Sequence, residues 1–133
     1  MSQHARHPAV SEMITATRLL INQVGVREAA ELQRLDAAIL IDLRDVRELQ
    51  KMGVVPRAFH APRGMLKLRA DPDCLYHKPV FQTDKKLVLF CASGLRSVLP
   101  ARTLQDMGMD NVLNLQDGFT KWKMQDLPVD YLT

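Results

Sequence analysis

The sequence contains few cysteines, few aromatic side chains and no long apolar run, and each shortage excludes a class of protein. Two cysteines, Cys74 and Cys91, are too few for a disulfide scaffold and are typical of a reducing compartment. Aromatic residues make up 5% of the chain and basic residues form no long run, which argues against a nucleic-acid partner. No apolar stretch approaches the length that crosses a bilayer, so we expect no membrane partner. Residues 1–18 lack the order of a secretion signal, and we expect a cytoplasmic location.

The composition is otherwise that of one folded domain. The 133 residues are 47% hydrophobic and 25% charged, and the net charge of +3 leaves small anions unrepelled. Residues 1–10 show no period and predict a flexible N-terminal arm, followed by a domain over residues 11–133. The arm carries His4 and His7, but two histidines in such a segment are more often unbound than metal-binding. We therefore expect no metal site.

Short apolar runs alternate with segments of helical period. This alternation is typical of a parallel sheet with helices on both faces, so we expect a single α/β domain with a five-stranded parallel sheet. Pro100 lies too far inside one predicted helix to be free of cost and is expected to bend it. The predicted strands are 19–24, 38–41, 58–60, 87–90 and 111–115, and the predicted helices are 11–16, 26–35, 46–52, 65–70, 96–108 and 118–124.

The central feature is a cysteine between a buried strand and a helix. Residues 87–90 are apolar, Cys91 follows them, and Gly94 and Arg96 precede the helix. Backbone N–H groups converge at such a junction and favour a negative charge, so the Cys91 thiol is expected to ionise readily. A free cysteine is often only a small core residue, but the glycine and arginine favour a functional thiolate. Arg96 either buttresses this loop or meets a bound anion.

Other polar residues follow the predicted strands. Ligands of open parallel sheets bind beyond the carboxyl ends of the strands. Asp42, Arg44, His60, Cys91 and Asp117 all lie at such ends, so we expect them on one rim of the sheet. Asp42 and Arg44 are expected to form a structural ion pair that holds the rim rather than to act in catalysis.

Three segments together resemble the single-domain rhodaneses, which are thiosulfate sulfurtransferase-like proteins. They are LIDLRD at 40–45, with a strand and an Asp-x-Arg entry, CASGLRS at 91–97, which matches the active-site loop, and GFTKW at 118–122, the closing segment. The resemblance spans roughly residues 11–129, including the spacing between the segments. It implies a rhodanese-like domain.

The resemblance also implies a sulfurtransferase that carries sulfur on Cys91. The thiolate would take sulfur from a small anionic donor such as thiosulfate, and a thiol or, in the test tube, cyanide would remove it. Asp42, Arg44 and His60 are the implied supporting residues, and neither a cofactor nor a metal is implied. A protein sulfur acceptor stays open. The implied substrate-binding residues, whose backbone N–H groups would hold the persulfide, are Ala92, Ser93, Gly94, Leu95, Arg96 and Ser97.

Some positions depart from the family pattern. The usual Gly-His-Ile-Pro-Gly-Ala run appears as GVVPRA at 53–58, with Arg57 in place of the turn glycine. Asp117 replaces the first of two glycines before the last helix. Ala92 and Ser93 are uncharged where strongly thiosulfate-directed members often carry basic residues, so thiosulfate is expected to be a poor proxy for the real donor.

Other interpretations stay open. Phosphatases and arsenate reductases use a related loop with one more residue between cysteine and arginine than the four found here, Ala92 to Leu95. A non-catalytic rhodanese module could bind a partner, and a Cys–His hydrolase would need His60 as its base. Cys74 either resolves a Cys91 persulfide or has no role, and with His77 it forms only half of a zinc site.

Overall fold

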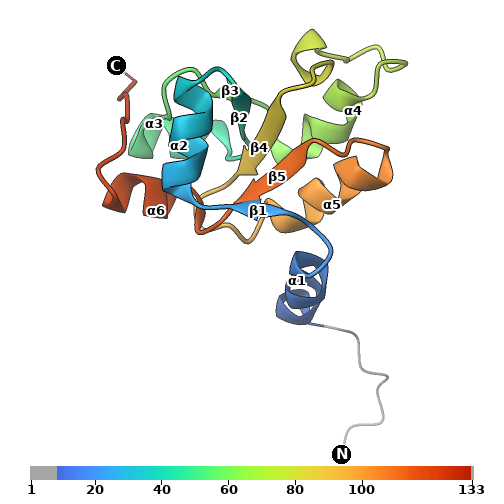
Figure 1. Cartoon of the computed structure of the whole chain (residues 1–133), viewed down its shortest axis with the longest axis horizontal. Coiled ribbons are helices and arrows are strands. Elements are labelled where there is room, and N and C mark those ends of the chain that lie inside the picture. The colour runs from blue at the N-terminus through green and yellow to red at the C-terminus, as the bar shows by residue number, and fades with distance from the viewer. Residues whose placement is uncertain (1–8, 133) are drawn as a thin grey trace, which may run out of the picture.

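The computed structural model describes residues 9–132 (Figure 1). Residues 1–8 of the predicted arm, including His4 and His7, lie outside the described residues, and Val10 begins the first helix. No helix between residues 9 and 132 is long and apolar enough to cross a bilayer. The helices are α1 Val10–Arg18, α2 Val26–Arg34, α3 Val46–Met52, α4 Leu66–Ala70, α5 Val98–Asp106 and α6 Gly118–Met124, with 3-10 turns η1 Arg63–Met65 and η2 Pro79–Phe81. The strands are β1 Gln23–Val24, β2 Ala38–Asp42, β3 Phe59–His60, β4 Lys86–Phe90 and β5 Val112–Leu115.

The strands form one parallel sheet in the order β1-β5-β4-β2-β3, which confirms the predicted fold class. The register aligns the carboxyl ends of the central strands, because Asp42 pairs with Phe90 on one side and with His60 on the other. Cys91 directly follows Phe90. The sheet therefore brings Asp42, His60 and Cys91 to the same edge, as the order of motifs predicted.

The two faces of the sheet are buried in separate apolar cores. Along β4, Leu87 and Leu89 belong to the core under α1, α4 and α5, while Val88 and Phe90 belong to the core under α2 and α6. Figure 1 shows these helices on opposite sides of the sheet. The four side chains of residues 87–90 are 0% exposed, and each contributes roughly 1.5–3 kcal/mol through burial. The strand that leads to Cys91 is thus buried on both faces of the sheet.

The structure corrects two local predictions. The strand predicted for 19–24 is reduced to Gln23–Val24, because α1 continues to Arg18 and Leu19 is 86% exposed. The cost expected at Pro100 was wrong, because α5 starts only at Val98. Pro100 therefore lies in the first turn, where a backbone N–H has no partner within the helix and its loss costs little.

Candidate active site

The Cys91 loop, residues 91–97, runs from the end of β4 to the start of α5. Gly94 has φ +84°, in the left-handed region that glycine adopts without penalty. A Cβ at Gly94 would lie 3.0 Å from the backbone nitrogen of Asp117, so glycine also permits a close approach to the β5–α6 turn. Within residues 9–132, no backbone N–H of residues 92–97 donates a hydrogen bond. These amides are available to an anion.

The Cys91 sulfur lies at the buried end of a relay, a series of polar side chains joined by hydrogen bonds. Its Sγ is 3.5 Å from Ser97 Oγ, and the Ser97 hydroxyl donates to Asn114 Oδ1 at 2.5 Å. Asn114 Nδ2 in turn donates to Gln23 Oε1 at 3.2 Å. A hydrogen bond therefore joins Cys91 to Ser97, and either atom can be its donor. Cys91 is 0% exposed, so a sulfur donor reaches Sγ only after loop residues move.

The turn between β5 and α6 holds the loop from one side. The Phe119 N–H donates to the Cys91 carbonyl at 2.8 Å, and the Thr120 N–H donates to the Ala92 carbonyl at 2.8 Å. Gly118 has φ +60°, and a Cβ there would collide with the Cys91 carbonyl oxygen and lie 2.8 Å from that of Ala92. The segment matched as the closing motif therefore fixes the backbone of the cysteine itself.

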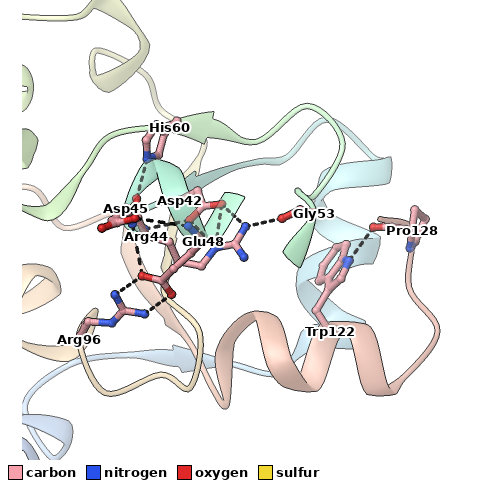
Figure 2. A network of polar contacts seen from close by, with 9 residues as sticks. All are labelled: Asp42, Arg44, Asp45, Glu48, Gly53, His60, Arg96, Trp122 and Pro128. Atoms are coloured by element: carbon pink, nitrogen blue, oxygen red, sulfur yellow. Dashed lines mark hydrogen bonds and ion pairs between the residues drawn. The ribbon is translucent and has the colours of Figure 1, made fainter. Parts of the chain in front are cut away.

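An ion pair holds the loop from the other side. Arg96 Nη1 and Nη2 donate to Glu48 Oε1 and Oε2 at 2.6 and 2.7 Å (Figure 2). The hydrogen bonds from Arg96 lower the pKa of the Glu48 carboxyl, and those to Glu48 raise the pKa of Arg96. A negative charge on Cys91 further raises the pKa of Arg96, so the guanidinium lies within electrostatic reach of the sulfur. Of the two roles predicted for Arg96, the structure supplies the buttress.

The Glu48 carboxylate is positioned by the start of α3. Asp45 caps this helix, and its carboxylate accepts from the Arg47 N–H at 2.7 Å. Glu48 completes a capping box by accepting from the Asp45 N–H at 3.4 Å. The helix cap and the loop buttress therefore share one carboxylate.

The predicted supporting residues come together in one cluster, in which Asp42 and Arg44 are buried and His60 is half-buried (Figure 2). Arg44 Nη2 donates to Asp42 Oδ2 and to the Gly53 carbonyl, both at 2.8 Å, and its guanidinium lies 4.0 Å from the centroid of the Phe119 ring. His60 Nε2 lies 2.6 Å from the Arg44 carbonyl oxygen. In the described chain no hydrogen bond joins His60 to Cys91, so the Cys–His hydrolase has no positioned base.

Cys74 stays apart from this cluster. It is free and half-buried in the segment between α4 and η2, and its N–H donates to Asp71. Across residues 9–132, no three His, Cys, Asp or Glu side chains gather as metal ligands would.

Sequence reasoning missed Glu48, Asn114 and Phe119. Two of them carried a signal in the sequence: Asn114 is polar within the apolar run 112–115, and Glu48 lies three residues after Asp45, the spacing of a capping box. Phe119 contributes its ring to Arg44 and its backbone N–H to the Cys91 carbonyl, and the second of these contacts depends on no residue type.

The structure is thus a parallel α/β sheet with a braced cysteine loop at its carboxyl edge. The rhodanese-like domain family matches residues 26–125, and the chain belongs to this family. This confirms the family that the motifs indicated.

Individual relatives share the fold at modest identity. A sulfurtransferase from Allochromatium vinosum is 25% identical over 111 residues, which cover 83% of this chain and 95% of the relative. A solved structure from Rhodopseudomonas palustris CGA009, a protein of unknown function described as a "possible tyrosine phosphatase", is 35% identical with a TM-score of 0.89, covering 98% of this chain and 100% of that one. The polysulfide-sulfur transferase homodimer from Wolinella succinogenes is 27% identical with a TM-score of 0.71, covering 91% and 86%.

Proposed function

We propose that this protein is a sulfurtransferase that carries sulfane sulfur as a persulfide on Cys91. The observation that supports it most is the set of loop amides, residues 92–97, that donate no hydrogen bond within the described chain and follow a braced cysteine. Two relatives of the chain are named sulfurtransferases, which agrees with this proposal. A cytoplasmic location fits, because Cys74 and Cys91 are both free.

The reaction proceeds in two balanced steps. The Cys91 thiolate attacks the outer sulfur of a small anionic donor such as thiosulfate, the donor S–S bond breaks, and sulfite leaves with the electron pair of that bond. A thiolate, or cyanide in an assay, then attacks the outer persulfide sulfur, and the bond to Cys91 breaks to restore its thiolate. The chain's own residues supply the nucleophile and the anion-binding amides, and no step uses a cofactor. A protein thiol could serve as acceptor in place of a small one.

The surroundings of Cys91 suit a negatively charged persulfide. Backbone N–H groups of residues 92–97 stabilise the terminal sulfur without a general base. Cys91 is fully buried, which shields its own sulfur from water between the two steps. The same burial requires that the loop open for each donor and acceptor.

Intact-mass analysis tests the proposal. We expect the wild-type chain to gain one sulfur atom after incubation with thiosulfate, 3-mercaptopyruvate or glutathione persulfide, and to lose it on addition of cyanide. Cys74→Ser should behave as wild type, whereas Cys91→Ser should gain nothing. A sulfur gain that persists in Cys91→Ser would overturn the assignment.

A phosphatase is the competing activity, and the description of the R. palustris protein brings it forward. Two observations argue against it here. The loop is one residue shorter than that of phosphatases, and both terminal nitrogens of Arg96 are bonded to Glu48 rather than free for a phosphate. Hydrolysis of p-nitrophenyl phosphate that is lost in Cys91→Ser, without any sulfur gain by the wild type, would favour the phosphatase.

A further inference from the structure

A cavity of about 310 Å³ opens beside the Cys91 loop. One face of α3 and the start of α6 form its walls, and Ala92, the residue after the cysteine, lines it as well. Figure 1 places α3 and α6 on the same side of the sheet. The volume falls at the small end of the range for low-molecular-weight ligands. It is therefore the natural space for a substrate that approaches Cys91.

The cavity carries unbalanced positive charge. Arg47 and Lys51 both line it and lie four residues apart on α3, so they share one helix face. Both are exposed, and neither side chain forms a hydrogen bond or ion pair with any residue between 9 and 132. The one carboxylate in the lining, that of Glu48, is already paired with Arg96. Two like charges at this spacing repel each other slightly, and no carboxylate in the described chain pairs with either of them.

The floor adds a buried guanidinium, whose charge is paired with Asp42, and an apolar surface. Arg44 lines the cavity and is 0% exposed, yet its Nη1 is buried without a hydrogen-bond acceptor in the described chain. A buried donor of this kind calls for a partner that the chain does not supply. Its guanidinium covers the Phe119 ring, and Met52, which is 41% exposed, completes an adaptable apolar wall.

We propose that this cavity binds the carboxylate end of a low-molecular-weight thiol that accepts the sulfur from Cys91. This inference rests on the proposed function and names the class of acceptor. Arg47 and Lys51 attract the carboxylate, the apolar wall contacts the body of the molecule, and its sulfur lies toward Ala92. The thiolate then forms a bond to the outer persulfide sulfur, while the electron pair of the broken S–S bond stays on Cys91. No external oxidant or reductant is consumed.

Binding of a non-reactive probe tests the cavity without any turnover. S-methylglutathione, which has two carboxylates and no free thiol, is titrated by NMR into the wild type, the double variant Arg47→Gln/Lys51→Gln, and the control Lys78→Gln/Lys86→Gln. The control removes the same charge from two exposed lysines, and Lys86 begins β4 at the opposite edge of the sheet.

We expect the cavity variant to bind about tenfold more weakly and the control to bind as the wild type does. The S-methylglutathione diethyl ester, which lacks free carboxylates, should bind the wild type and the cavity variant equally. Equal affinity of the acid in both double variants, or no binding to the wild type at millimolar concentration, would overturn the inference.

Turnover separates this inference from the proposed function. With the persulfide formed beforehand, the cavity variant should show a raised KM for glutathione and an unchanged KM for 2-mercaptoethanol, which has no carboxylate. An equal rise for both acceptors would show a general defect and reject the cavity as the carboxylate site. If the wild type gains no sulfur, the proposed function fails, and the binding titration still decides whether the cavity recognises carboxylates.

Discussion

The ion pair between Glu48 and Arg96 should control how often Cys91 becomes accessible. Cys91 is 0% exposed, so a thiol reagent modifies it only when the loop opens. Glu48→Gln removes the charge that holds Arg96, while glutamine still accepts a hydrogen bond from the Asp45 N–H and preserves the helix cap. We therefore expect faster modification of Cys91 without loss of the fold.

The size of the effect follows from the exposure of the pair. The Arg96 and Glu48 side chains are 41% and 30% exposed, so water screens their attraction. A pair of this kind contributes up to about 1 kcal/mol. Opening of the loop breaks this pair in the wild type, so Glu48→Gln removes up to that energy from the closed state. The equilibrium constant for opening, and with it the rate of Cys91 modification, should therefore rise by about fivefold.

The assay is the rate of alkylation by iodoacetamide, followed by intact mass. A Cys74→Ser background leaves Cys91 as the sole reactive thiol. Glu31→Gln is the matched control, because it breaks a comparable carboxylate–guanidinium pair with Arg34 on α2. An unchanged rate in Glu48→Gln, or an equal increase in Glu31→Gln, would refute the buttress.

Three further perturbations follow from the same geometry. Arg96 lowers the pKa of Glu48 below its ordinary value of 4.5, so the ion pair stabilises the fold fully above about pH 4.5 and no longer does once the pH has fallen through the lower folded pKa. Urea titrations at a series of pH values should therefore show that Glu48→Gln is less stable than wild type above about pH 4.5 and equally stable at the acid end. Gly118→Ala should lower the free energy of unfolding by about 3 kcal/mol, because the backbone there is left-handed and the new Cβ would clash with the loop carbonyls. A melting temperature equal to that of the wild type would contradict this. Asn114→Leu leaves the buried Ser97 hydroxyl without its acceptor and should lower the free energy of unfolding by about 2 kcal/mol. The double variant Asn114→Leu/Ser97→Ala should lose clearly less than the sum of the two single variants, and strict additivity in this double-mutant cycle would exclude the relay.

The sheet and the position of the cysteine could be predicted because local pattern and burial agree there. The apolar run 87–90 becomes the central strand, buried on both faces, and its end fixes where Cys91 lies. The first strand could not be placed as well. Leu19 and Leu20 look like strand residues but are exposed after α1, since only packing against β5 decides where pairing begins.

The partners that hold the loop follow a different logic. Glu48 lies 48 residues before Arg96, and Asn114 lies 17 residues after Ser97, so no local spacing joins them. Both contacts exist because parallel strands bring the ends of β2, β4 and β5 together. The residue types of a rim can therefore be predicted from strand ends, but the pairs within it depend on the register and on side-chain direction.

The two glycine replacements noted in the sequence show that the backbone of the rim is more constrained than its side chains. Arg57 has φ +66° and Asp117 has φ +65°, each at a position where the resembled pattern has glycine. A left-handed conformation costs a residue with a side chain roughly 1–2 kcal/mol, less for aspartate. The chain keeps this conformation at Asp117 because the next residue, Gly118, must approach the Cys91 and Ala92 carbonyls. The close contact under the loop, rather than the preference of any single residue, thus sets the shape in which the cysteine works.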